Sequence, residues 1–148
     1  MSLKEKITED MKTAMRAKDT SRLEVIRMLR AAIQRREVDD RIELDEQGVL
    51  AVIQKMIKQG QDSISQFNAG NRPDLADKEQ LGIDILKTYL PEPISDAEID
   101  DLVSSAIEQT GAASLRDMGK VMGILKSQIA GRADMGSVSK RIKERLGG

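Results

Sequence analysis

The chain has 148 residues and a formal net charge of −1; 33% of its residues are charged and 39% are hydrophobic, enough for one ordinary domain or two small helical ones. Only Phe67 and Tyr89 are aromatic, so the core must be built from aliphatic residues and methionine, a composition that favours packed helices over a β-sandwich. The absence of Cys and His excludes disulfides, Cys or His zinc sites, thiol nucleophiles and histidine general bases.

Four helices are predicted in the first part of the chain, because apolar residues recur there at helical spacing between segments that interrupt the pattern. Gly70 is expected to end the third of them. The carboxylates of residues 35–46 lack the spacing of a calcium-binding loop, so we interpret this segment as a solvated connection. The helix starts are marked by residues that cap or fit a first turn: Ser2, Ser21, Asp45 or Glu46, and Pro73.

Pro91 and Pro93 mark the clearest boundary, because proline cannot continue a helix. Three more helices are predicted after it: one capped by Ser95, one over residues 115–130, and one capped by Asp134. We therefore predict an all-α protein, with an N-terminal helical domain of about four helices at residues 1–92 and a small three-helix domain at residues 93–148.

The segment DMGKVMGILK (residues 117–126) has the apolar spacing of a helix but contains two glycines. A glycine inside a helix costs about 1 kcal/mol relative to alanine. On a helical wheel with residue 119 at zero, five apolar residues form a core stripe at about 200–300°: Met118, Val121, Met122, Leu125 and Ile129. A second face, at about 0–80°, holds only small residues with a lysine at its edge: Gly119, Gly123, Ser127, Ala130 and Lys126.

Two interpretations of this small-residue face stay open. It could receive a neighbouring helix, or it could let a phosphate backbone come close to the helix. Residues 111–148 hold eight Lys and Arg against three Asp and Glu, a net charge of +5, whereas residues 45–110 have a net charge of −8. An anionic partner is therefore expected to meet the last third of the chain, where Lys120, Lys126 and Arg132 would supply charge.

Several blocks of sequence, in order and over the whole length, resemble the GatB/YqeY family and its stand-alone YqeY-like proteins: KEKITEDMKTAMRAKDTSRLEVIRMLRAAI, KMIKQGQDSISQFNAGNRPDLADKE, YLPEPIS, DMGKVMGILK and GRADMGSVSKRIKERL. In that family the domain also forms the C-terminal tail of the B subunit of the glutamyl-tRNA(Gln)/aspartyl-tRNA(Asn) amidotransferase. The resemblance implies an all-helical fold and a tRNA-binding, accessory role for the tail.

The resemblance carries over to residues 119–123 and to Gly131, which match the glycine–lysine motif and the loop glycine of the family. The helical wheel and the charge count add lysines and an arginine of the last third of the chain to this set of candidate RNA-binding residues. The expected RNA-binding residues are Gly119, Lys120, Gly123, Lys126, Arg132, Lys140 and Lys143.

We therefore expect a non-catalytic accessory module that binds tRNA or another structured RNA, without a cofactor, a metal or catalytic residues. The label of a carbon–nitrogen ligase with glutamine as amido-N-donor would belong to the full amidotransferase complex, because this chain lacks the catalytic body of the B subunit. The alternative is a protein–protein interaction adaptor without RNA binding, whose acidic middle docks a basic partner. No apolar run approaches the ~20 residues of a membrane span, and residues 1–10 lack the apolar core of a signal peptide, so we expect a cytoplasmic protein without membrane association.

Overall fold

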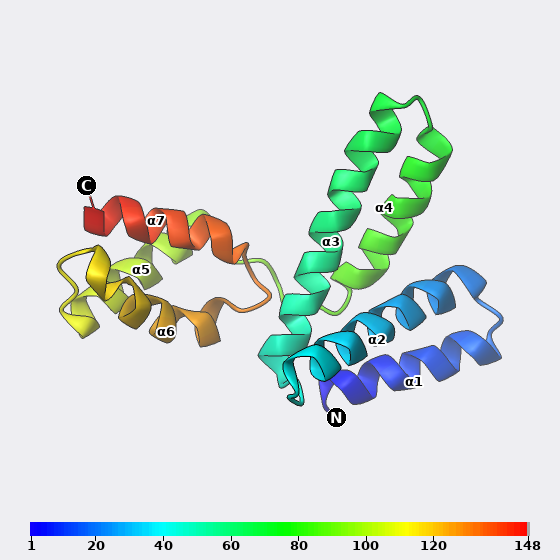
Figure 1. The fold of residues 1–148 in the computed structure, drawn as a ribbon, viewed down its shortest axis with the longest axis horizontal. Helices are drawn as coiled ribbons and strands as arrows, with labels where there is room; N and C mark the ends of the chain where they lie inside the picture. The colour runs from blue at the N-terminus through cyan, green and yellow to red at the C-terminus, as the bar shows by residue number, and fades with distance from the viewer. Residues whose placement is uncertain (148) are drawn as a thin grey trace. The chain divides into compact units, whose positions relative to one another are not determined.

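The computed structural model describes residues 1–147, and within that range it is all-helical (Figure 1). The described part contains no strand, which confirms the predicted all-α class. A short 3₁₀ turn, Leu115–Asp117, precedes α6. The α-helices are α1 (Leu3–Arg16), α2 (Thr20–Asp40), α3 (Glu46–Ala69), α4 (Pro73–Lys87), α5 (Asp96–Thr110), α6 (Met118–Ile129) and α7 (Met135–Gly147).

Side-chain caps fix most of the helix starts. The predicted start of α2 at Ser21 is wrong by two residues, because the carboxylate of Asp19 accepts the backbone N–H of Arg22 at 3.2 Å and caps the helix earlier. Pro73 occupies the first turn of α4, as predicted. Three other predicted caps each accept the N–H of the residue three positions on: Ser2, Asp45 and Ser95.

The charged segment 35–46 is not one solvated connection, because α2 continues through Asp40. Glu37 accepts the N–H of Leu44 at 2.7 Å and lies 2.5 Å from the ammonium group of Lys4, and these contacts lower the pKa of its carboxyl group. Asp45 caps α3. The carboxylates that looked like a cluster in the sequence are therefore divided among separate structural contacts.

The structure divides into two compact units, Met1–Leu90 and Pro91–Gly148, which separate two residues before the boundary predicted from sequence. In the N-terminal unit, α1 pairs with α2 and α3 pairs with α4 as two antiparallel hairpins (Figure 1). Its core is aliphatic apart from Tyr89: Ile7, Ile26, Leu29, Ile33, Leu44, Val49, Val52, Ile53, Ile57, Ile83, Leu86 and Tyr89.

Tyr89 connects the end of the second hairpin to the first. Its ring is buried, with 6% of its surface exposed, and its hydroxyl donates a 2.7 Å hydrogen bond to the carboxylate of Asp10 in α1. Burial, and then this hydrogen bond, raise the pKa of Tyr89 above its usual value. The side chain is thus a core residue of the N-terminal unit.

In the C-terminal unit, α5, α6 and α7 pack around their own core (Figure 1). Val121, Leu125 and Ile129 of α6 are fully buried, which confirms the core stripe predicted on the wheel. Among the described residues, no helix has the length and apolar character needed to cross a bilayer. The buried core consists of Ile94, Ile99, Val103, Ala106, Val121, Leu125, Ile129, Val138 and Ile142.

Candidate nucleic-acid interface

The two glycines of α6 lie on its exposed face, turned away from the core stripe. A Cβ atom added to Gly119 or Gly123 would meet no heavy atom within 4 Å outside the backbone of its own helix. Both residues are exposed, whereas Val121 and Leu125 on the other side of α6 are fully buried. For the part of the chain described here, the interpretation that a neighbouring helix covers the glycines is therefore wrong.

Lysines border this glycine face on both sides. Lys120 is 70% exposed and lies 3.8 Å from the carboxylate of Asp117, a weak solvent-screened pair. Lys126 is also exposed, and no side chain among residues 1–147 pairs with it. An incoming anion would therefore meet Lys126 without first having to displace a protein carboxylate.

Asp117 fixes the start of the 3₁₀ turn that precedes α6, a role that the sequence analysis missed. Its carboxylate accepts the backbone N–H of Ala113 at 3.0 Å and, more weakly, that of Ser114 at 3.4 Å. The first of these hydrogen bonds is the main reason why the pKa of Asp117 lies below its usual value. The signal for this cap was present, because Ser114 and Asp117 have the three-residue spacing of a capping box.

Arg132 has a structural contact rather than a free surface position. Its Nε atom donates to the backbone carbonyl of Glu92 at 3.0 Å, and its guanidinium lies 3.7 Å from the carboxylate of Glu98 in α5. The backbone carbonyl of Arg132 in turn accepts the N–H of Ile94 at 3.0 Å. These contacts tie the loop after α6 to the start of the unit, so Arg132 is only partly available to a ligand.

The arginines of α7 also face α5. Arg141 lies 2.8 Å from the carboxylate of Asp96 and 2.7 Å from that of Asp100, and its side chain is 30% exposed. Arg145 donates a hydrogen bond to the hydroxyl of Ser104. The planar guanidinium can make several hydrogen bonds at once, which suits these inter-helix contacts better than a lysine would.

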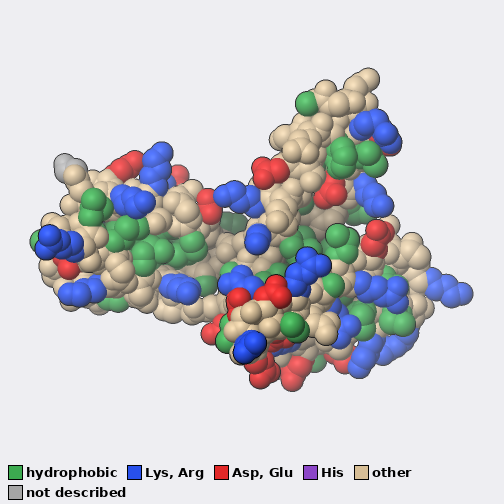
Figure 2. All heavy atoms as spheres, in the orientation of Figure 1, with side chains coloured by type: hydrophobic (Ala, Val, Ile, Leu, Met, Phe, Trp, Pro, Cys, Tyr) green, Lys and Arg blue, Asp and Glu red, His purple; other side chains and the backbone are tan. Residues whose placement is uncertain are grey.

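Lys140 and Lys143 of α7 are exposed, and helical geometry places them opposite the buried Val138 and Ile142. No side chain in the described part of the chain pairs with either lysine. Figure 2 shows Lys and Arg side chains of this unit at several separate places on the face in view, with other atoms between them. The predicted residues therefore form a glycine–lysine face on α6 and a lysine pair on α7, whereas Arg132 belongs to the contacts with α5.

The unit separates its charges by helix. α5 carries five Asp and Glu residues and no basic residue, whereas α6 and α7 together carry six Lys and Arg residues and one Glu. Over residues 91–148 there are eight basic and nine acidic residues, so the unit has almost no net charge. The basic character predicted for the last third of the chain is thus a property of two helices.

The sequence profile of Yqey-like proteins matches residues 4–146. The chain belongs to this family. It is 37% identical over 145 residues to Altered inheritance of mitochondria protein 41, mitochondrial, of Pyrenophora tritici-repentis, covering 96% of this chain and 80% of that protein. Proteins of the same name from Lachancea thermotolerans and Candida glabrata are 40% and 37% identical, with 70% and 69% of this chain covered. The match covers 57% of each of these two proteins, so this Yqey-like chain spans a little over half of their length.

These relatives contradict the expected cytoplasmic location. All three are named as mitochondrial proteins, which points to a mitochondrial rather than a cytoplasmic location. The features behind that expectation, the absence of a long apolar run and of the apolar core of a signal peptide, are compatible with either compartment. They could not have separated the two.

Proposed function

We propose that the C-terminal unit of this Yqey-like protein binds the phosphate backbone of a structured RNA, with tRNA as the first candidate. The observation that carries the proposal is the uncovered glycine face of α6, where Gly119 and Gly123 leave open space beside the exposed Lys126. A glycine on an exposed helix face lowers the stability of the helix without any gain in packing. Because glycine has no Cβ, it would let a phosphate backbone lie closer to the helix, and this would explain the two glycines.

The mode of recognition follows from the side chains of the unit. Both aromatic residues of the chain, Phe67 and Tyr89, lie in the N-terminal unit, so the C-terminal unit has no ring on which an RNA base could stack. Lysines favour contacts to phosphates, which position an RNA without reading its sequence. The proposal is therefore recognition of RNA shape and charge, and it assigns no reaction to this chain.

The test is a fluorescence anisotropy titration of labelled total tRNA with the full chain. Lys120→Glu/Lys126→Glu should weaken binding strongly and reduce the slope of log affinity against log salt by roughly 1.5, because each phosphate contact contributes about 0.7–0.9. The control, which makes the same change of charge, is Lys55→Glu/Lys58→Glu, an exposed lysine pair on α3. Arg132 is left unchanged, because its loss would disturb the loop that it holds.

Equal affinity of the wild type and the Lys120→Glu/Lys126→Glu variant would refute the assigned face. If the control pair weakened binding as much as the α6 pair, the effect would be one of total charge, and the proposal would fail as well. Far-UV circular dichroism of each variant checks that the helices are retained.

A further inference from the structure

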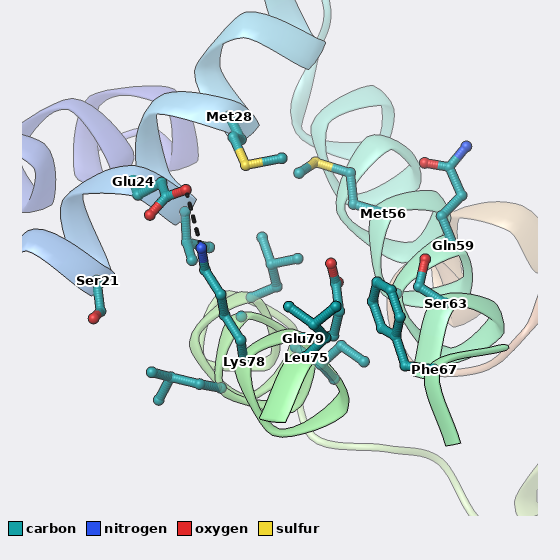
Figure 3. Close-up of a pocket in the computed structure, with 16 residues that line it drawn as sticks. Ser21, Glu24, Met28, Met56, Gln59, Ser63, Phe67, Leu75, Lys78 and Glu79 are labelled. Carbon is teal, nitrogen blue, oxygen red and sulfur yellow. Dashed lines mark ion pairs between the residues drawn. The ribbon is translucent and has the colours of Figure 1, made fainter. Parts of the chain in front are cut away.

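The N-terminal unit contains an apolar groove of about 450 Å³ between α2, α3 and α4 (Figure 3). A Cβ on Gly60 of α3 would lie only 3.0 Å from Ile83 of α4, whereas one on Gly82 would be in ordinary contact with Val25 of α2, at 3.6 Å. α3 and α4 therefore approach closely at Gly60, which lines the groove. The apolar side chains that line it include Val25, Met28, Met56, Phe67, Leu75 and Leu81.

The edges of the groove expose large apolar side chains to solvent. Met28 is 59% exposed and Leu81 is 47% exposed, and both line the groove. Figure 3 shows the side chains of Met28 and Met56 pointing toward one another from α2 and α3. Contiguous exposed apolar surface of this kind marks interaction sites, and methionine adapts to the shape of a partner.

A carboxylate without a partner lies in this apolar setting. Glu79 is half-buried, and its Oε2 atom lies 3.5 Å from the position of a Cβ on Gly60. Within residues 1–147, no donor or cation pairs with it. The other charged groups of the groove, Glu24 and Lys78, lie 3.8 Å apart and balance each other (Figure 3). The groove therefore carries one uncompensated negative charge, which a cation on its occupant would stabilise.

The dimensions fit a helix better than a compact ligand. The lining residues of α4 extend from Leu75 to Leu86, which is about 16 Å, or three helical turns, at 1.5 Å per residue. The exposure of Met28 and Leu81 shows that the groove opens to solvent at its edges, whereas a small-molecule site buries most of its ligand. An amphipathic helix places apolar side chains at this spacing along one face.

We propose that this groove receives a basic amphipathic helix of a partner protein, about three turns long. Its apolar face covers Met28, Met56 and Leu81, and one of its Lys or Arg side chains pairs with Glu79. This site lies on the N-terminal unit and is independent of the RNA interface proposed for α6 and α7.

The test is selection from a phage-displayed library of peptides of roughly 16 residues, with apolar residues fixed at helical spacing and Lys, Arg, Asp and Glu mixed at the remaining positions. Parallel selections use the wild type, Met28→Glu and, as a matched control, Met15→Glu, which changes a 49% exposed methionine outside the groove. We expect wild type and Met15→Glu to enrich the same peptides, rich in Lys and Arg, and Met28→Glu to lose them. For a selected peptide, Met28→Glu should raise the Kd at least tenfold, and Glu79→Gln should raise it about tenfold.

Four outcomes would overturn the proposal. Enrichment of acidic peptides would show that charge complementarity at Glu79 is not involved. Retention of the same binders by Met28→Glu would show that the peptides do not bind in the groove. No enrichment over the Met28→Glu selection would show that the groove binds no such helix. Concentration-dependent dimerisation that Met28→Glu abolishes would make a second copy of the chain the occupant instead. Because the groove and α6 lie in different units, Met28→Glu should leave tRNA binding unchanged.

Discussion

Replacement of Gly123 by alanine should stabilise the protein while weakening its binding to RNA. Gly123 lies in the middle of α6, its backbone φ is not positive, and a Cβ there would touch nothing within 4 Å. The substitution therefore loses no contact and creates no clash, and it gains the helix propensity of alanine, about 1 kcal/mol in the free energy of unfolding. For a unit of this size, such a change corresponds to an increase in Tm of roughly 4–8 °C.

The measurements are thermal unfolding followed by far-UV circular dichroism, and tRNA anisotropy with the same variant. Gly119→Ala is a weaker version of the same change, because Gly119 is the second residue of α6, where propensity counts less. The added methyl groups should hold a phosphate backbone farther from the helix, so the affinity for tRNA should fall although the charge is unchanged.

Destabilisation by Gly123→Ala would refute the conclusion that this face is open. A stabilised variant with unchanged tRNA affinity would refute the proposed use of the glycines, while leaving the lysine contacts to be tested separately. The combination of greater stability and weaker binding is the result that the proposed interface requires.

Three further predictions concern other contacts. Gly60→Ala should lower the free energy of unfolding by about 1–3 kcal/mol, because its methyl carbon would lie 3.0 Å from Ile83; urea denaturation measures this, and a stabilised variant would contradict it. Above pH 10 the unfolded chain loses the tyrosine proton before the folded chain does, because the pKa of Tyr89 is raised in the folded state. The titration of Tyr89 should therefore leave the free energy of unfolding unchanged below that pH and lower it above that pH by up to about 1.4 kcal/mol per pH unit. Alkaline denaturation measures this; Tyr89→Phe should lack this component, and an equal slope for both proteins would contradict the prediction. Arg141→Ala should lower the Tm of the C-terminal unit by a few degrees, because it removes the ion pairs with Asp96 and Asp100 of α5. Lys143→Ala, at an exposed position without an ion pair in the described part of the chain, should change the Tm little. Equal effects of the two substitutions would show that the ion pairs of Arg141 add no stability.

Much of the fold could be predicted because its signals are local. Ser2, Asp45 and Ser95 cap helices through bonds to residues three positions away, and the core stripe of α6 follows from helical periodicity. The start of α2 was misplaced because Asp19 and Ser21 are both competent caps, and only the structure distinguishes them.

The candidate sites depend on contacts between segments far apart in the sequence. The exposed glycines of α6 could be assigned to one face from the wheel, but whether another helix covers that face is a question of packing. The charge count treated Arg132 like Lys126, although only the arginine meets a carbonyl and a carboxylate from residues 92–98. The groove was not predicted, because the close approach of Gly60 to Ile83 joins helices that show no motif in the sequence.

The segregation of acidic residues on α5 from basic residues on α6 and α7 makes the C-terminal unit an electric dipole rather than a cation. Beyond the Debye length, about 8 Å at physiological salt, an RNA would experience almost no net attraction to it. Encounter with RNA should therefore be only weakly accelerated by long-range steering, in contrast to proteins with a large positive net charge. At short range the dipole would act as an orienting device, because α5 repels the phosphates while the lysines attract them. Selectivity would then arise from the orientation of the complex, and the unit would bind flexible polyanions less readily than its two basic helices alone would predict.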